Sequence, residues 1–139
     1  MDQDLFKKLF DAALKARGNS YSPISKYMVG AAIRTKTGNI YVGTNAEDAA
    51  LNHTIHAEQA CIAQMVSIEG RQEITELVVV ANGDDELFCT PCGHCRQLLL
   101  EFSPGSLEIY SATPEGEIKL KATLNDLLPY PFRIENFIK

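Results

Sequence analysis

The sequence predicts a single α/β domain over residues 1–139, in which helices flank a central mixed sheet of five strands. Apolar residues at helical spacing alternate along the chain with short runs that are typical of strands. The resulting order is helix, strand, strand, helix, strand, helix, strand, strand, helix, which places helices on the faces of one sheet. The length of 139 residues, with 45% hydrophobic and 22% charged residues, suits one domain with a hydrophobic core.

The chain opens with a predicted amphipathic helix. Apolar residues recur at helical spacing over residues 4–17. Asp2 or Asp4 can serve as its N-cap, and Gly18 is a stop signal. We therefore expect this helix to cover one face of the sheet.

The central part predicts a hairpin, a loop and a buried helix. Strands are expected over residues 27–35 and 40–44, joined by a Thr-Gly-Asn turn as an antiparallel hairpin. Small residues in the first strand would let another element pack closely. After a loop over 45–52, residues 56–68 are apolar nearly all round and predict a buried helix closed by Gly70.

The remaining elements complete the alternation. Residues 77–81 form a continuous apolar run, the pattern of a strand buried on both faces in a sheet with parallel neighbours, and an acidic loop over 82–86 follows. Pro91 stands at the start of a helix over 92–102. Strands over residues 107–111 and 118–120 and a short helix over 123–128 complete the order.

Composition limits the classes of partner. The net charge of −5 and a pI near 5.1, without a basic run, oppose binding to nucleic acid and favour a small, weakly charged substrate. Charged residues interrupt the first fifteen positions, so we expect neither a signal peptide nor a membrane span and place the protein in the cytoplasm. In that reducing compartment, the four cysteines favour metal binding over disulfides.

Two short stretches carry the chemistry. His56-Ala57-Glu58 and Pro91-Cys92-Gly93-His94-Cys95 together offer one imidazole and two thiols at the spacing of zinc ligands. A fourth position would remain for water, whose pKa zinc lowers from about 15.7 to about 7. This pairing is the signature of the zinc nucleobase deaminases.

Glu58 is placed to move protons beside the metal. It lies two residues after His56, so it points away from ligation but stays near the same helix end. Cys92 and Cys95 are three residues apart at the start of a helix, where the helix dipole favours thiolates. The expected site is thus Zn²⁺ held by His56, Cys92 and Cys95, with Glu58 as the proton shuttle.

The same residues also allow other interpretations. The CxxC pair could be a redox pair. Cys89 could fill the fourth position and close a structural Cys₃His zinc site, which would make the protein a non-catalytic interaction domain. We expect His53 and His94 to be solvent-facing or locally hydrogen-bonded, and Cys61 to be a small core residue.

Further segments resemble those of cytidine deaminases, and the resemblance runs from Tyr21 to Phe132. It is carried by the two metal stretches and by three further segments: Tyr-Ser-Pro-Ile-Ser-Lys-Tyr-Met-Val-Gly-Ala-Ala over residues 21–32, Gly-Thr-Asn-Ala-Glu over 43–47, and Leu-Leu-Pro over 127–129 followed by Phe132. The resemblance implies a three-layer cytidine deaminase-like fold. It also implies hydrolysis of cytidine and 2′-deoxycytidine to uridine and 2′-deoxyuridine with release of ammonia, a step of pyrimidine salvage. A homo-oligomer is implied too, with a tetramer favoured over a dimer.

The resemblance assigns the substrate contacts. Asn45 and Glu47 would hold the ribose, and their amide and carboxylate suit sugar hydroxyls. The carboxylate also repels phosphate, which favours a nucleoside over a nucleotide. The remaining roles implied by the family are the Ala57 N–H on the pyrimidine O2, the Thr90 carbonyl on the exocyclic amine, Tyr27 packing on the base, and Phe132 completing a neighbour's pocket.

Several positions depart from the family pattern. The small tetrameric members usually carry cysteine in place of His56 and arginine in place of Gln59. One imidazole and two thiolates on Zn²⁺ leave no net charge, so Gln59 needs none, and Arg96 is available to hydrogen-bond a thiolate. Tyr27 replaces a phenylalanine and Leu51 a tyrosine. A modified cytosine nucleoside, or an aminonucleoside antibiotic such as blasticidin S, is therefore an alternative substrate. The extra proline at position 131 and the missing Gly-Pro alter the segment around Phe132.

Overall fold

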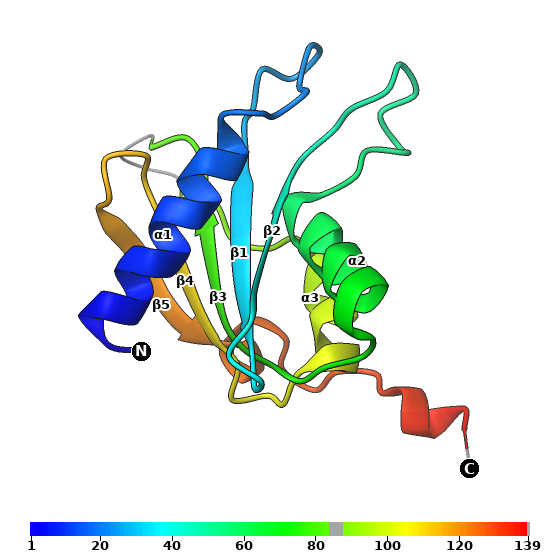
Figure 1. Ribbon diagram of the computed structural model, residues 1–139. Coiled ribbons are helices and arrows are strands. Elements are labelled where there is room, and N and C mark those ends of the chain that lie inside the picture. Colours follow the sequence, from blue (N-terminus) through cyan, green and yellow to red (C-terminus); the bar gives the residue numbers. More distant parts are fainter. Residues whose placement is uncertain (84–87, 139) are drawn as a thin grey trace.

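The computed structural model describes residues 1–83 and 88–138, and its elements alternate as the sequence predicts (Figure 1). The expected acidic loop over 82–86 lies mostly outside the described residues. The elements are α1 (Gln3–Arg17), β1 (Gly30–Thr35), β2 (Ile40–Thr44), α2 (Ala57–Glu69), β3 (Ile74–Val80), α3 (Gly93–Phe102), β4 (Glu108–Ala112), β5 (Ile118–Thr123), α4 (Leu124–Leu127) and a 3₁₀ turn (Ile134–Asn136).

The five strands form one mixed sheet in the order β2-β1-β3-β4-β5, which confirms the predicted class. Strands β1 and β2 form the expected antiparallel hairpin. Strand β3 is buried as predicted, but only β4 runs parallel to it, whereas β1 runs antiparallel. The expected parallel pairing is therefore present on one side of β3 and not on the other. A continuous apolar run indicates that both faces of a strand are covered, and it carries no information about strand direction.

Helix α1 covers one face of the sheet. Its N-cap is Asp2, whose carboxylate accepts from the Leu5 N–H at 2.8 Å. The helix can approach β1 closely because Gly30 has no side chain: a Cβ there would lie 1.9 Å from the Ala13 carbonyl oxygen. The apolar cluster on this face comprises Leu9, Ala13, Ala32, Val78 and Val80.

Helices α2 and α3 cover the opposite face, where Ala31, Ile33 and Val79 point into the larger core cluster. Gly43 of β2 lets α2 approach, since a Cβ there would lie 2.3 Å from the Ala57 carbonyl oxygen. Three layers result: α1, the sheet, and the α2–α3 pair (Figure 1).

Helix α2 is not buried all round in this chain, so that prediction was wrong for the single subunit. Val66 is 44% exposed and Ile68 is 68% exposed, on the side of the helix away from the sheet. The opposite side, with Cys61 and Met65, is fully buried. A helix with apolar residues on its solvent side has a surface that is suited to contact with another molecule.

Strand β1 begins at Gly30, three residues later than predicted. Side chains satisfy the backbone just before it: Asn45 donates to the Tyr27 carbonyl at 2.7 Å and accepts from the Val29 N–H at 3.0 Å. The Thr44 hydroxyl donates to the Val29 carbonyl at 2.7 Å. These bonds replace ladder pairing, which a strand pattern in sequence does not reveal.

Strand β3 begins three residues earlier than predicted, and strand β5 ends three residues later. The segment after α4 projects from the body of the molecule (Figure 1). Among the described residues, no helix combines the length and the apolar character that crossing a membrane requires.

Candidate functional site

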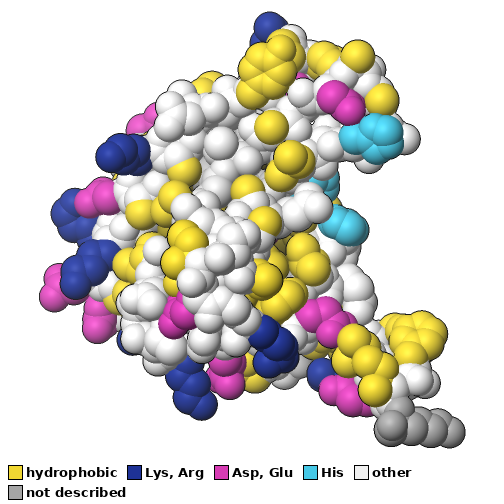
Figure 2. Space-filling model, turned by 45° about the vertical axis from the view of Figure 1, so that its right-hand side comes forward, with side chains coloured by type: hydrophobic (Ala, Val, Ile, Leu, Met, Phe, Trp, Pro, Cys, Tyr) yellow, Lys and Arg dark blue, Asp and Glu magenta, His cyan; other side chains and the backbone are white. Residues whose placement is uncertain are grey.

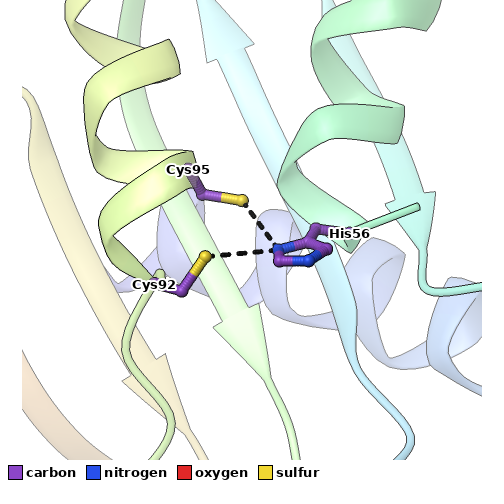
Figure 3. Close-up of side chains that lie close together, drawn as sticks. All are labelled: His56, Cys92 and Cys95. Atoms are coloured by element: carbon purple, nitrogen blue, oxygen red, sulfur yellow. Dashed lines mark hydrogen bonds between the residues drawn. The ribbon is translucent and has the colours of Figure 1, made fainter. Parts of the chain in front are cut away.

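Two helix N-termini meet at one point, and each delivers part of a metal-binding group. His56 is the N-cap residue of α2, and Cys92 is the N-cap residue of α3 with Cys95 one turn further on. The His56 Nδ1 lies 3.3 Å from the Sγ atoms of both cysteines (Figure 3). The three donor atoms all lie within 4.8 Å of one another.

The spacing of these donors fits tetrahedral zinc. With Zn–N near about 2.1 Å and Zn–S near about 2.3 Å, tetrahedral geometry separates nitrogen from sulfur by roughly 3.5 Å. The observed 3.3 Å is close to that value. Cys89 does not belong to the donor group found among the described residues, which weakens the case for a closed Cys₃His site.

Gln59 fixes the entry into α2. Its side-chain oxygen accepts from the His56 N–H at 3.3 Å, which ties the backbone of His56 to the first helical turn. The residue that replaces the arginine of the family pattern thus holds the backbone of the imidazole donor.

Glu58 lies directly beside the donor group. It is only 5% exposed, and its Oε2 lies 3.6 Å from the Cys95 Sγ. Burial raises the pKa of the Glu58 carboxyl, and its own backbone N–H and the His56 imidazole lower it to a smaller extent. A carboxyl with a raised pKa in a closed site is suited to taking up and returning protons.

The helix N-terminus does not by itself make a thiolate of Cys95, contrary to our expectation. Burial, followed by the charge of Glu58, raises the pKa of Cys95 well above its usual range. A coordinated cation overcomes such effects and deprotonates a thiol outright. Metal binding at this site therefore releases protons.

A cavity of about 290 Å³ opens next to the donor group. Its lining includes Tyr27, Asn45, Glu47, Ala57 and Glu58, which come from separate segments of the chain. Ala57 is the first residue of α2, where a backbone N–H has no acceptor within its own helix. The structure thus brings most of the predicted substrate contacts to one cavity beside the predicted metal ligands.

Asn45 and Glu47 form the base of one cavity wall. Besides its two backbone bonds, the Asn45 side chain accepts from the Ser20 hydroxyl at 2.6 Å through its amide oxygen. Glu47 accepts from the N–H groups of Ile24 and Ser25 at 3.1 and 3.2 Å. Hydrogen bonds, led by that from Ser25, lower the pKa of Glu47, so this carboxylate stays charged at neutral pH.

Most of the chain matches a known protein family and curated members of it. The family model for the cytidine and deoxycytidylate deaminase zinc-binding region matches residues 3–111. A cytidine deaminase from Sporosarcina psychrophila is 39% identical over 130 residues, which cover 94% of this chain and 93% of that protein. The chain belongs to the cytidine and deoxycytidylate deaminase family.

Solved structures of family members superpose on the whole fold. A cytidine deaminase from Burkholderia pseudomallei is 29% identical with a TM-score of 0.83, covering 95% of this chain and 100% of that one. One from Mycobacterium tuberculosis is 32% identical with a TM-score of 0.78, covering 96% and 100%. The resemblance noted in the sequence is thereby confirmed, and the zinc-binding region of this family together with the donor group identifies Zn²⁺ as the cofactor.

Two predicted contacts of the deaminase site do not line the cavity. Thr90 stands in sequence between two lining residues, Cys89 and Cys92. Among the described residues, the one hydrogen-bond donor to its carbonyl is the Cys89 thiol, at 3.8 Å. Phe132 is 54% exposed on the projecting C-terminal segment, where it packs against Phe137 with ring centroids 5.0 Å apart. Its predicted role in a neighbouring subunit stays a prediction.

Sequence reasoning missed three lining residues of this cavity, Ser25, Val29 and Thr54, and it considered Cys89 only as a fourth metal ligand. The position of Ser25 two residues before Tyr27 was a usable signal, but nothing marks Val29 or Thr54. Burial raises the pKa of Cys89 to about 11, so it stays a neutral thiol beside the site. Outside the cavity, His94 is exposed, His53 pairs with Asp48 at 3.3 Å, and Cys61 is buried.

Proposed function

We propose that this protein hydrolyses cytidine and 2′-deoxycytidine to uridine and 2′-deoxyuridine, releasing ammonia. The observation that carries the proposal is the shared cavity: two members of the donor group, His56 and Cys92, line the same space as Glu58, Asn45 and Glu47. That space, about 290 Å³, lies at the small end of the range for ligand sites, which suits a nucleoside. We thus propose a zinc-dependent nucleoside deaminase that acts in pyrimidine salvage.

The proposed ligands are His56, Cys92 and Cys95. Zn²⁺ held by these residues would supply a hydroxide nucleophile at neutral pH. Glu58, buried beside Cys95, would take one proton from the attacking water and deliver it to the pyrimidine N3. It would then take the remaining proton from the hydroxyl formed at C4 and pass it to the departing amine, which leaves as ammonia. The overall balance is one cytidine and one water giving one uridine and one ammonia.

The base and the ribose are held by the cavity wall. The Ala57 N–H donates to the pyrimidine O2, and the Thr90 carbonyl accepts from the exocyclic amine. Asn45 and Glu47 offer their remaining hydrogen-bonding capacity to the ribose hydroxyls. Because Glu47 is charged, a 5′-phosphate is disfavoured in its vicinity. Tyr27, which is 39% exposed at the cavity, packs against the base.

We further propose that the active form is a homo-oligomer, with a tetramer favoured over a dimer. The exposed apolar side of α2 supports an interface between copies. Hydrophobic side chains also gather on the projecting C-terminal segment (Figure 2), where Phe132, Phe137 and Ile138 are each more than half exposed. Phe132 would reach the cavity of a neighbouring subunit.

The test is a substrate panel with the purified, zinc-loaded protein. Cytidine, deoxycytidine, their monophosphates, cytosine, adenosine and blasticidin S are compared by ammonia release. We expect the two cytosine nucleosides to be turned over far faster than the monophosphates or the free base. Preferential turnover of blasticidin S would shift the assignment to the antibiotic, and absence of turnover of every compound would refute deamination.

A further inference from the structure

The side chain of Arg96, the residue after Cys95, donates its hydrogen bonds to neutral oxygen atoms and not to a thiolate. Its Nε donates to the Pro91 carbonyl at 2.6 Å, and its two terminal nitrogens donate to the Thr90 hydroxyl and the Leu127 carbonyl, each at 2.8 Å. A planar, permanently charged fork is well suited to holding three oxygens in a fixed arrangement. Within the described part of the chain, Arg96 makes no hydrogen bond to His56, Cys92 or Cys95, so the expected bond to a thiolate is not formed.

These bonds immobilise the peptide that carries the Thr90 carbonyl. On one side of it, the Cys89 carbonyl accepts from the Ser111 hydroxyl on β4. On the other side, Arg96 holds both the Thr90 hydroxyl and the Pro91 carbonyl. Among the residues that the structure describes, the Thr90 carbonyl receives one contact, the long one from the Cys89 thiol, which is a weak donor that an amine readily displaces.

The same guanidinium reaches the base of the C-terminal segment. The Leu127 carbonyl that Arg96 holds belongs to the last residue of α4. Gln97, the residue after Arg96, donates to the Phe132 carbonyl at 2.7 Å. Two consecutive residues of α3 thus hold the chain before the metal ligands and the chain that leads to the exposed C-terminal aromatics. A shift of the C-terminal segment would be transmitted to the Thr90–Pro91 peptide through Arg96.

We propose that Arg96 is a positioning residue that aims the Thr90 carbonyl at the exocyclic amine of the substrate and couples this acceptor to the C-terminal segment. The inference rests on the proposed function, because it takes cytidine as the substrate. It makes Arg96 important for ligands that carry the amine. Ligands that lack the amine do not use the acceptor and should depend on Arg96 far less.

The test compares two ligands in R96Q. The substrate is cytidine, and the probe is pyrimidin-2-one riboside, which has hydrogen in place of the amine and is measured as an inhibitor. We expect kcat/KM for cytidine to fall about tenfold to hundredfold, since several hydrogen bonds from a charged donor are lost. The inhibition constant of the probe should change less than about threefold. Guanidinium ions added to R96A should restore part of the lost cytidine activity.

Two further variants keep the test sharp. T90V removes only the hydroxyl that Arg96 holds, so it should show the same preference for the probe at a smaller, few-fold amplitude. R71Q is the matched control, because Arg71 also donates to a main-chain carbonyl, that of Glu101 at 2.6 Å, away from the cavity. It should leave both ligands unaffected.

Parallel losses for substrate and probe, or loss of zinc from R96Q at neutral pH, would overturn the inference and make Arg96 a support of the metal site. If R96Q does not fold, T90V decides: equal weakening of both ligands, or no effect on either, also counts against the proposal. Failure of the proposed function looks different, because the unmodified protein would then not deaminate cytidine.

Discussion

The two halves of the candidate active-site cavity are built in different ways. The metal corner, comprising His56, Glu58, Cys92 and Cys95, is formed by the first turns of two helices that pack on the same face of the sheet. The proposed nucleoside wall, comprising Tyr27, Asn45 and Glu47, is formed by segments that side-chain hydrogen bonds between distant parts of the chain hold together. Thr90 stands beside this wall and is held by Arg96.

This difference predicts two kinds of response to substitution. Each donor in the metal corner is placed by a rigid helix and has no substitute, so its loss should abolish the metal or the chemistry. In the wall, several hydrogen bonds together hold the segments in place. The loss of one of these bonds should therefore weaken substrate affinity by a limited factor. We therefore expect larger losses from substitutions in the metal corner than from those in the wall.

The largest effect is expected from C95S, which replaces a buried thiol donor by a hydroxyl. We expect C95S to purify with little zinc and no measurable activity, since one of only three protein ligands is lost. C61S is the matched control, because Cys61 is equally buried but donates to the Ala31 carbonyl and lies outside the donor group. It should keep its zinc. X-ray absorption of the unmodified protein should count two sulfur ligands per zinc, and three would place Cys89 in the coordination sphere.

E58Q should separate metal binding from catalysis. The amide fits the buried space of the carboxyl but cannot transfer a proton, so we expect kcat to fall about 10²- to 10⁴-fold with zinc content unchanged. Metal analysis and uridine formation measure the two properties on one sample. E69Q, at the other end of α2, removes a carboxylate that bonds Thr37 and Tyr41, and should leave kcat near normal. Near-normal turnover by E58Q would remove Glu58 from the mechanism.

The contrast between the two regions also explains what could be predicted from the sequence. The metal corner depends on spacings of two and three residues at helix starts, so His56, Cys92 and Cys95 could be selected from the sequence alone. The order of strands and helices could be predicted from hydrophobic periodicity, and the structure confirms that order. Both are local signals.

The rest depends on contacts between distant segments. Residues 27–29 look like a strand, but bonds from Asn45, 16 to 18 positions away, replace the ladder there. The partners of Arg96 include Leu127, 31 positions away, so its role could not be assigned from its place beside Cys95. Likewise, the sequence pattern shows that α2 is apolar nearly all round, but not that Val66 and Ile68 are exposed in the single chain.

N45A should break the wall without touching the metal corner. The side chain bonds Ser20, Tyr27 and Val29, so its removal takes away the hydrogen bonds that it makes to the backbone of the 27–29 segment. We expect KM for cytidine to rise about tenfold with kcat changed less, and zinc to stay bound. The exposed Asn52 provides the control N52A, which should behave normally. If N45A lowered kcat as strongly as E58Q, the two regions would not be separable.

The smallest effect concerns the charge of Glu47 and appears in the pH dependence of stability. Hydrogen bonds hold the pKa of Glu47 below its usual range, so the carboxylate stabilises the fold above the unfolded pKa of about 4.3. This contribution is lost as the pH falls through the lowered pKa of the folded state. The Tm difference between the unmodified protein and E47Q should therefore be constant near neutral pH and shrink in acid.

Zinc loss in acid affects both proteins alike, so the difference between them isolates Glu47. E117Q is the control, because Glu117 is an exposed carboxylate that pairs with Lys119 at 2.9 Å; it should give no comparable pH-dependent difference. A Tm difference for E47Q that grows in acid would have the wrong sign for a carboxylate stabilised in its charged form. In that case Glu47 would be protonated in the wall, and its proposed repulsion of nucleotide phosphates would fail with it.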